Sequence, residues 1–512
     1  MYQNKFYSNF SENKIFISII FISGFLMRLV FLPYEIPITL DGMDYFLYAI
    51  DLSRGNIFPE GYLINKFGWG IFLSPIFNIF QNSELLELMN IQRLTSISIS
   101  CVTIIPIYYV IKRFFDPKIA LIGSALFIFN PKIIENSILG ITDALFIFLI
   151  FSSIMLILSK KIKFQIFSFF IGGLSFVVRP EGILIFLVLV TVLFFRHEHI
   201  KKTIKCLFLG IVIFLGTLYV SDLLITSEND QISIFDTIYN FKNLDSEEIS
   251  YGEKEVGNLS NNFDKFLLNS ISKFVIYSGW ILLPNMIFFT ILSIIKIKKN
   301  ISKNKILFFI IYLELSLTAF FAYGKNIEET RYLFVLFLPI LLFSSYGINV
   351  IIKKIKIKNK IPLLLIMIII SSGIFTAITV DDDYNYQKEL IFAVNILVDD
   401  AKGVNLFEDS RFVKSSELLK NWPKLPDLKE NLKMKLNVIK FSTEDYSSIG
   451  EFVKENQKNG LTHILVKEKN GDPLFYDLFE SEDDYPYLEK IFDYSDHNFK
   501  NKILIFKIIE NI

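Results

Sequence analysis

Apolar blocks dominate the sequence, and short basic stretches separate them. The blocks run to about 15–25 residues, close to the roughly 20 apolar residues that a helix needs to cross a membrane. Of the 512 residues, 52% are hydrophobic and 54 are Phe. The hydrophobic residues occur in continuous runs, whereas in a soluble helical protein they recur at helical spacing. We therefore predict an all-α polytopic membrane protein.

The basic residues decide which apolar blocks cross the membrane. The candidate spans are 15–33, 67–81, 91–111, 118–134, 141–159, 164–178, 182–195, 203–225, 276–296, 304–323, 332–352 and 361–380. Lys and Arg cluster in the connecting segments 112–118, 160–163, 196–205, 296–305 and 353–360. All five clusters are cytoplasmic, as the positive-inside rule requires, if the N-terminus is inside and 67–81 does not cross. That segment is short and contains Pro75, so we predict eleven spans in the cell membrane.

This topology divides the chain at about residue 380. Residues 1–380 form the transmembrane domain, with a large first outer loop at 34–90. Residues 381–512 contain acidic runs and two strand-like pieces, THILV (462–466) and KILIFKI (502–508). We predict that this tail is a small extracytoplasmic α/β domain.

The first outer loop carries acidic residues directly after the first span. In ITLDGMDYFLYAIDLSRG (38–55), a helix beginning at Asp41 places Asp44 and Asp51 on one face and apolar residues on another. Such a helix would lie on the outer membrane surface. Asp41 and Asp44 also suit the positive end of a helix dipole, so a capping role is an equal alternative.

Three further charged clusters fall on the predicted outer side. Arg179 and Glu181 occupy the turn VVRPEG (177–182), where a mutual ion pair is the simpler interpretation. Asp143 begins a span, where it could cap the helix. Charges of both signs on one side of a membrane indicate a polar outward cavity.

The third of these clusters is EETRYLFVLFLP (328–339). Glu328 lies beside Arg331 at the mouth of a span, and Tyr332 falls in the aromatic belt. Interfacial snorkelling is the alternative for this arginine. A guanidinium pairs bidentately with phosphate oxygens, and a carboxylate can take the proton of an incoming hydroxyl. The clusters therefore suit transfer of a sugar from a lipid-linked phosphate.

LDGMDYFLYA (40–49), RPEG (179–182) and ETRYLFVLFLP (329–339) resemble motifs of the GT-C superfamily of membrane glycosyltransferases. Protein O-mannosyltransferases and the aminoarabinose transferases that modify lipid A would be the nearest relatives. The resemblance implies a GT-C fold, a polyprenyl-phosphate-linked sugar donor, a lipid or protein acceptor and a catalytic acid in the first outer loop. The WWDYG signature of oligosaccharyltransferases is absent, which disfavours transfer of a whole oligosaccharide.

Residue by residue, Asp41 matches the first-loop aspartate of the superfamily. O-mannosyltransferases typically have an adjacent Asp-Glu pair where this chain has Asp41-Gly42, so either Asp41 or Asp44 could be the base. The resemblance implies that Arg179 and Arg331 bind the lipid phosphate. Glu181, Tyr332, Asp143 and Glu328 complete the predicted donor site.

The resulting prediction is an inverting enzyme that transfers one sugar. The alternatives are a flippase or transporter of lipid-linked saccharides, and a sugar-polymer ligase or polymerase. Ionisable residues are scarce within the spans, which favours the transferase over a carrier. Without a His cluster or closely spaced carboxylates we predict no cofactor and no metal site, and a net charge of zero argues against nucleic acid as a partner.

Overall fold

The computed structural model describes residues 2–39, 41–55, 67–196, 200–226, 263–297, 302–355, 361–400, 405–407, 412–421, 443, 446–469 and 471–509. The chain folds into two compact units. Unit 1 comprises Met1–Leu32, Tyr45–Ile79 and Ile91–Ala377, and unit 2 comprises Pro33–Asp44, Phe80–Asn90 and Ile378–Ile512. Each unit is described by itself below.

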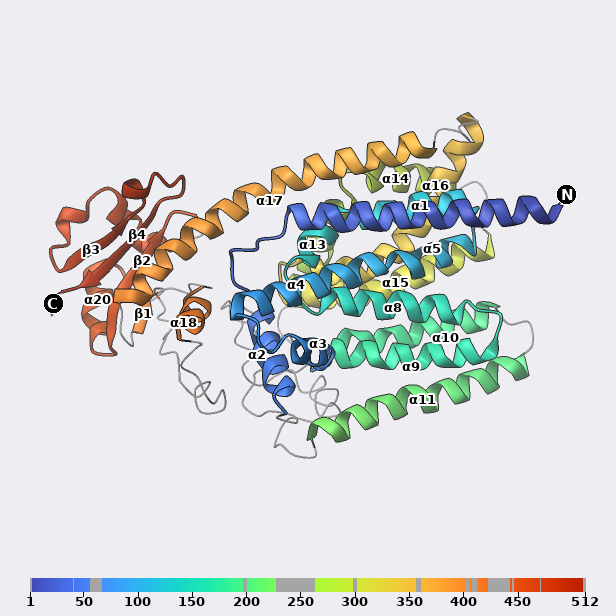
Figure 1. Ribbon diagram of the computed structural model, residues 1–512, viewed down its shortest axis with the longest axis horizontal. Coiled ribbons are helices and arrows are strands. Elements are labelled where there is room, and N and C mark those ends of the chain that lie inside the picture. The colour runs from blue at the N-terminus through green and yellow to red at the C-terminus, as the bar shows by residue number, and fades with distance from the viewer. Residues whose placement is uncertain are drawn as a thin grey trace. The chain divides into compact units, whose positions relative to one another are not determined.

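Helices run through the described part of the chain from residue 2 to residue 400 (Figure 1). The helices are α1 (Tyr2–Val30), α2 (Asp41–Ser53), α3 (Gly68–Ile79), α4 (Leu85–Val102), α5 (Ile104–Lys112), α6 (Pro117–Ile128), α7 (Pro131–Ser137), α8 (Asp143–Ile157), α9 (Ile162–Val178), α10 (Ile185–Arg196), α11 (Ile200–Thr226), α13 (Phe263–Leu282), α14 (Met286–Ile297), α15 (Lys303–Gly324), α16 (Phe337–Ile355) and α17 (Ile361–Asp400). Two 3₁₀ segments, η1 (Pro180–Leu184) and η3 (Thr330–Leu336), precede α10 and α16.

The helices agree with the predicted apolar blocks and make this an integral membrane protein. Within the described residues, five helical stretches are long and apolar enough to cross a membrane, or seven if two bent pairs each count as one span. They are 85–112, 200–221, 303–324, 330–353 and 362–400, and the bent pairs are α6–α7 and α13–α14. The total of eleven spans and their orientation stay predictions.

The block predicted to span at 276–296 is bent. The chain bends by 115° between α13 and α14, across Leu283–Asn285. Pro284 lies in this break, and a proline has no amide hydrogen with which to continue a helix. The second bent pair, α6–α7, turns by 54° at Asn130, whose side chain accepts a hydrogen bond from the Lys132 amide and so caps α7.

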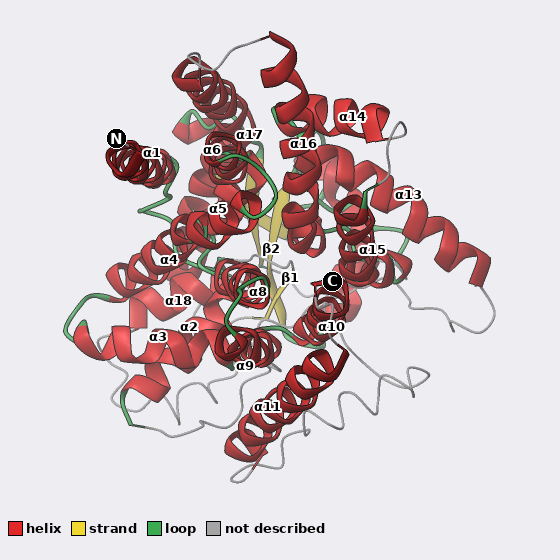
Figure 2. Cartoon of the chain, turned by 90° about the vertical axis from the view of Figure 1, so that its right-hand side faces the viewer, coloured by secondary structure: helices red, strands yellow, loops and turns green. Residues whose placement is uncertain are grey.

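Helix α8 lies inside the bundle of unit 1. It packs against α5, α9 and α10, while α11 covers α9 from outside (Figure 2). Its side chains are almost all buried, including Leu149, Ile150 and Phe151. A helix that is apolar all round is stable only when other helices or lipid surround it. The N-terminal end of α8 therefore lies at a fixed point of the bundle.

A cation on α1 is buried within this bundle. Arg28 of α1 is completely buried and donates hydrogen bonds to Ser137 Oγ (3.0 Å), Ser100 Oγ (3.3 Å) and the Gly24 carbonyl (2.9 Å). All three acceptors are neutral. These hydrogen bonds join α1 to α4 and α7 and fix the rotation of α1 about its own axis.

Helix α2 begins at Asp41, as predicted, but it does not have one exposed polar face. Every side chain from Tyr45 to Asp51 is buried. Phe46 packs against Phe77, with ring centroids 5.5 Å apart. The predicted surface-lying amphipathic helix is therefore wrong for this segment, because protein covers both of its faces.

Unit 2 contains a four-stranded sheet in the order β1-β2-β4-β3. Its strands are β1 (Asn405–Phe407), β2 (Leu461–Lys467), β3 (Leu488–Asp493) and β4 (Ile503–Ile508). β1 and β2 are parallel and the other pairs are antiparallel, with His463 opposite Lys507 and Leu465 opposite Ile505. The two strands predicted from THILV and KILIFKI are confirmed as β2 and β4.

The sheet has an apolar core on each face. On one face Leu465 and Ile505 pack with Leu390, Val394 and Leu397 from the second half of α17. On the other face the core comes from β2, β4, η5 (Pro473–Phe479) and α20 (Ile449–Gln457). Because β2 and β4 are apolar on both faces, the sheet requires both covers. α17 extends through the predicted domain boundary at residue 380, and the boundary between the units falls between Ala377 and Ile378.

A buried histidine lies at the edge of the first core. His463 Nε2 is 3.0 Å from Asp400 Oδ2, and Lys507 Nζ donates to the same oxygen at 2.9 Å. Burial lowers the pKa of His463 below its ordinary value of 6.5, and this effect outweighs the opposing one of Asp400. The folded state therefore disfavours protonation of His463 relative to the unfolded state.

We expect unit 2 to lose stability as the pH falls below about 6.5, because the unfolded state then binds a proton that folded His463 resists. At low pH, the equilibrium constant for unfolding of unit 2 should rise about tenfold for each pH unit by which folding lowers the pKa of His463. Hydrogen-exchange protection factors of the 461–467 amides in the full-length protein would measure it. His463→Gln should flatten this pH dependence, and His497→Gln, at an exposed position, should preserve it. An unchanged pH profile in His463→Gln would contradict this assignment.

Candidate functional site

A proline turn presents the first residue of the candidate site, Arg179. α9 ends at Val178, and Arg179 is extended (φ −150°, ψ 133°) before Pro180 begins η1. A residue that precedes proline avoids the helical region, so the RPEG sequence itself forces this break. A Cβ atom on Gly182 would lie 2.5 Å from the Phe176 amide nitrogen, so η1 packs directly on the last turn of α9. The turn thereby holds the Arg179 side chain in one direction.

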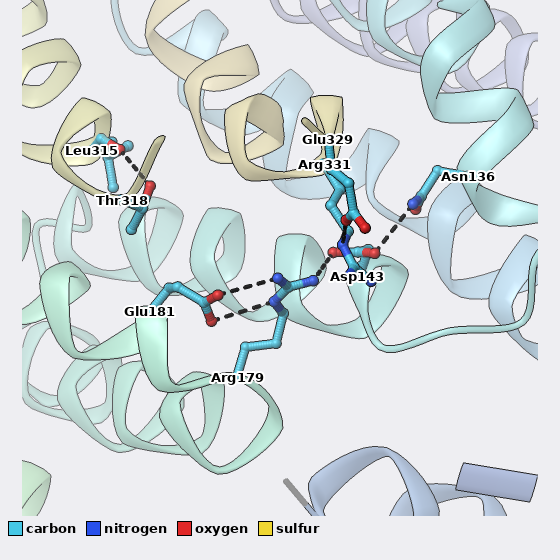
Figure 3. A network of polar contacts seen from close by, with 8 residues as sticks. All are labelled: Asn136, Asp143, Arg179, Glu181, Leu315, Thr318, Glu329 and Arg331. Carbon is cyan, nitrogen blue, oxygen red and sulfur yellow. Dashed lines mark hydrogen bonds and ion pairs between the residues drawn. The ribbon is translucent and has the colours of Figure 1, made fainter. Parts of the chain in front are cut away.

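The Arg179 guanidinium is bound by two carboxylates (Figure 3). Nη1 is paired with Asp143 Oδ1, the first residue of α8. Nε and Nη2 donate to the two oxygens of Glu181 at 3.4 and 3.2 Å. This fork geometry uses both edges of the guanidinium.

The loop before α8 fixes Asp143. Asn136 Nδ2 donates to Asp143 Oδ2 at 3.1 Å. The carbonyl of Gly140 accepts hydrogen bonds from Trp69 Nε1 (2.9 Å) and Gln92 Nε2 (2.7 Å). Gly140 has φ = 74°, a conformation that glycine adopts without strain. Contacts from α3, α4 and α7 therefore position one carboxylate for one arginine.

Arg179 remains charged in this setting. Burial by itself lowers the pKa of its guanidinium, but Asp143 and Glu181 outweigh burial and raise that pKa well above its ordinary value. The two carboxylates thus compensate the cost of burying this cation.

A second arginine reaches the same place from η3. The guanidinium carbons of Arg179 and Arg331 lie 5.6 and 5.9 Å from the centroid of the Tyr332 ring. Arg331 forms an ion pair with Glu329. Tyr323 donates a hydrogen bond to the Glu329 carbonyl (3.1 Å), which ties η3 to the end of α15. The electron-rich face of one tyrosine is thus shared by two cations, an arrangement favourable for both.

Exposure increases steadily across this cluster of Asp143, Arg179, Glu181, Glu329 and Arg331. The Asp143 side chain is 1% exposed and that of Arg179 6%, whereas Glu181 is 21%, Arg331 24% and Glu329 46% exposed. Two guanidinium groups accompany three carboxylates, so the cluster is slightly anionic. A ligand from outside would first meet the partly exposed groups, not the buried Asp143–Arg179 pair.

Glu328 lies in a neighbouring set of contacts. Lys273 Nζ donates to Glu328 Oε1 at 2.9 Å and also contacts the side chain of Asn326. Glu328 was predicted to lie beside Arg331. In the structure Arg331 forms an ion pair with Glu329, and Glu328 forms one with Lys273.

The structure thus brings together residues from three of the four predicted clusters. Asp143, Arg179 and Glu181 are in direct contact, and Tyr332 joins them to Arg331. The ion pair foreseen between Arg179 and Glu181 is present. The capping alternative for Asp143 is wrong, because Thr142 occupies the N-cap position and the Asp143 carboxylate binds Arg179.

Asp41 and Asp44 are half-buried in the first turn of α2 and belong to unit 2, whereas the other predicted site residues belong to unit 1. Their approach to the cluster stays a prediction. Asn136 was not predicted, because nothing in a sequence connects an amide with a carboxylate seven residues away across a loop. The described ranges contain no group of three His, Cys, Asp or Glu side chains suited to a metal ion.

Comparison with known proteins supports a fold class. The profile of the family described as dolichyl-phosphate-mannose-protein mannosyltransferase matches residues 72–220, a range that includes Asp143, Arg179 and Glu181. No curated protein sequence matches the chain.

Two solved membrane proteins share the fold at low sequence identity. ArnT from Cupriavidus metallidurans, in a crystal structure bound to undecaprenyl phosphate, is 11% identical, with a TM-score of 0.53 and coverage of 97% of both chains. The oligosaccharyltransferase AglB from Archaeoglobus fulgidus, in complex with an inhibitory peptide and a dolichol-phosphate, is also 11% identical, with a TM-score of 0.54, 89% of this chain and 69% of AglB being covered.

The chain thus shares the fold of ArnT and AglB, with apolar helices followed by a small sheet domain. The predicted resemblance to the GT-C superfamily of membrane glycosyltransferases is confirmed by the family profile together with these two folds.

Replacing Asp143 with Asn should destabilise unit 1 by about 3 kcal/mol, because Arg179 would keep its charge with only one carboxylate left. The matched control is Glu135→Gln, which removes a carboxylate whose pair with Lys132 is partly exposed. That change should cost less than about 1 kcal/mol. Free energies of unfolding of the purified full-length variants in detergent would test the difference, and equal losses would contradict it.

Proposed function

We propose that this protein transfers a single sugar from a polyprenyl-phosphate-linked donor to an acceptor on the extracytoplasmic side of the cell membrane. The acceptor hydroxyl attacks the anomeric carbon, the bond to the phosphate oxygen breaks, and the configuration inverts. Either Asp41 or Asp44 takes the hydroxyl proton, and the polyprenyl phosphate leaves with its charge stabilised by arginine.

The observation that carries this proposal is the pair of guanidinium groups sharing the Tyr332 ring at the end of apolar helices. The likeness to ArnT and AglB supports it, because structures of those two proteins contain undecaprenyl phosphate and a dolichol-phosphate, respectively. The site that binds the phosphate of this donor must allow the polyprenyl chain to remain among apolar helices. Arginine suits the phosphate, because its planar fork pairs with two oxygens at once.

The cluster assigns different roles to its arginines. Asp143 and Glu181 together engage Nε, Nη1 and Nη2 of Arg179, so its first role is to hold the site in shape. Arg331 is more exposed, and its partner Glu329 is the most exposed acid of the cluster. A phosphate would displace Glu329 from Arg331 first, and would reach Arg179 by displacing Glu181.

Asp41 and Asp44 are suited to act as the general base because of their position in the first outer loop and at the start of α2. They lie within one turn of each other at the start of α2. The positive end of the helix dipole favours carboxylates at these positions. No cofactor enters this proposal. The lysine-rich connectors would face the cytosol, with the N-terminus inside and the sheet domain outside.

Asp41→Asn and Asp44→Asn separate the two candidate bases. One of them should lower the rate of sugar transfer about 10²–10⁴-fold, because an amide cannot accept the hydroxyl proton. Asp116→Asn, at an exposed N-cap position of α6, is the control and should retain the full rate. Initial rates in membranes, with candidate polyprenyl-phosphate sugars offered in turn and products identified by mass spectrometry, provide the measurement. Full activity in both variants would remove this mechanism.

Arg331→Gln and Glu329→Gln should change lipid-phosphate binding in opposite directions. Loss of the arginine should weaken binding of undecaprenyl phosphate about tenfold or more, because a hydrogen bond to a charged group typically contributes that much to affinity. Loss of Glu329 should strengthen binding, because a competing negative charge is removed. Titration of the purified protein in detergent would measure both, and weaker binding in both variants would contradict the displacement of Glu329.

A further inference from the structure

A second polar feature lies at the other end of the bundle in unit 1. A cavity of about 240 Å³ is lined by residues that follow α5 and α8 and by the first turns of α15. Its polar lining residues are Arg113, Lys160, Lys303 and Asn304. α5 packs on α8, α8 on α10 and α10 on α15, and Figure 2 shows these helices as neighbours around one region. The cavity therefore lies between packed helix ends and is open on the side of its exposed polar residues.

Three of these lining groups are cations. Arg113 follows α5 directly, Lys160 lies in the turn after α8, and Lys303 is the first residue of α15. No carboxylate lines the cavity, and none of the three is in an ion pair with another described residue. By contrast, the arginines of the candidate site are each paired with acids. The cavity thus has an unbalanced positive charge that an anion would neutralise.

The start of α15 adds further donors. Ser302 is the N-cap residue, but its side chain makes no capping hydrogen bond. The first amides that bond back to the Ser302 carbonyl are those of Lys305 (2.9 Å) and Ile306 (3.2 Å). The amides of Lys303 and Asn304 have no acceptor among the described residues. Such amides at a helix N-terminus, reinforced by the helix dipole, favour a bound anion.

The inner lining is apolar and well packed. Leu158 and Leu307 are buried, and the Phe114 ring packs edge-on against Phe308 of α15 with ring centroids 4.8 Å apart. This contact holds the segment after α5 against α15. A cavity of this size is smaller than the roughly 300–1,000 Å³ pockets that enclose whole drug-sized ligands. It would accept a headgroup and leave a hydrocarbon tail outside, among the helices.

We infer that this cavity binds the phosphate of an anionic membrane lipid. Arg113, Lys160 and Lys303 contact the phosphate oxygens, and the first amides of α15 complete the site. A basic pocket between membrane helices is a recognised type of site for such headgroups. The shared chemistry is a phosphate anion, and the apolar lining assigns it to a lipid rather than to free phosphate.

This site is separate from the proposed sugar-transfer site. Asp143 begins α8 and Leu158 follows its last residue, so the two sites lie roughly 22 Å apart along that helix at 1.5 Å per residue. Ordinary interfacial lysines spread over a surface and project independently into water. Here three exposed cations from three segments line one cavity, and no acid lines it.

The test is lipid binding by the purified full-length protein, measured by native mass spectrometry with phosphatidylglycerol. Arg113→Gln, Lys160→Gln and Lys303→Gln should each weaken binding about fivefold, and the triple variant about 100-fold. The control triple variant combines Lys118→Gln, Lys201→Gln and Lys296→Gln, which removes the same charge from exposed positions outside the cavity. It should bind phosphatidylglycerol within about twofold of the wild type.

Equal loss of binding in the two triple variants would overturn the proposal, because a general electrostatic field would then explain the affinity. So would unchanged binding in the cavity triple variant. Inorganic phosphate in excess should leave the bound lipid in place, and its displacement of phosphatidylglycerol would overturn the assignment to a lipid. Binding of undecaprenyl phosphate at the other end should be equal in all these variants, which keeps the result independent of the proposed transfer reaction.

Discussion

The buried Arg179–Asp143 ion pair is the contact on which one end of the helical unit depends. The pair joins the end of α9 to the beginning of α8. Asn136 and the Gly140 loop hold the acid, Pro180 directs the arginine, and Tyr332 brings in η3. Because breaking a buried pair leaves an uncompensated charge, each of these contacts supports the others. The Arg179–Asp143 pair is rigid, and Glu181, Glu329 and Arg331 beside it are more exposed. This arrangement suits the recognition of a charged ligand.

The two ends of the helical bundle use charge in opposite ways. At the candidate site, acids outnumber arginines and every guanidinium has a carboxylate, so a ligand must compete with contacts already made. At the opposite end, cations surround a cavity without an acid. The first arrangement favours exchange of a ligand, as a transferase requires for each reaction cycle. The second favours stable occupancy, as a structural lipid requires.

Much of the fold could be predicted, because membrane burial leaves a strong sequence signal. The block 141–159 became α8 at 143–157, and the two strand-like pieces of the tail became β2 and β4. The continuation of α17 to Asp400 was missed, because the acidic run Asp381-Asp382-Asp383 was assigned to the start of the tail domain. Leu390, Val394 and Leu397 nevertheless have helical spacing, so the signal was present.

The candidate site was less predictable than the fold. Arg179 and Glu181 are two residues apart, so their ion pair could be foreseen. Asp143 is 36 residues from Arg179, and only the packing of α8 against α9 brings them together. Likewise, nothing local indicates that Lys273 binds Glu328 from 55 residues away. The residue types of the site could be inferred from the sequence, whereas their partners depend on tertiary structure.

The buried Arg28 has a consequence for the order of assembly. During synthesis α1 leaves the ribosome well before Ser100 and Ser137 exist, so its guanidinium has only the Gly24 carbonyl of its own helix as an acceptor. An arginine without partners is costly inside hydrocarbon, but Arg28 lies two residues from the end of α1, from where a long side chain reaches the aqueous boundary. The arginine of α1 can therefore take its final hydrogen bonds only after α4 and α7 have been synthesised.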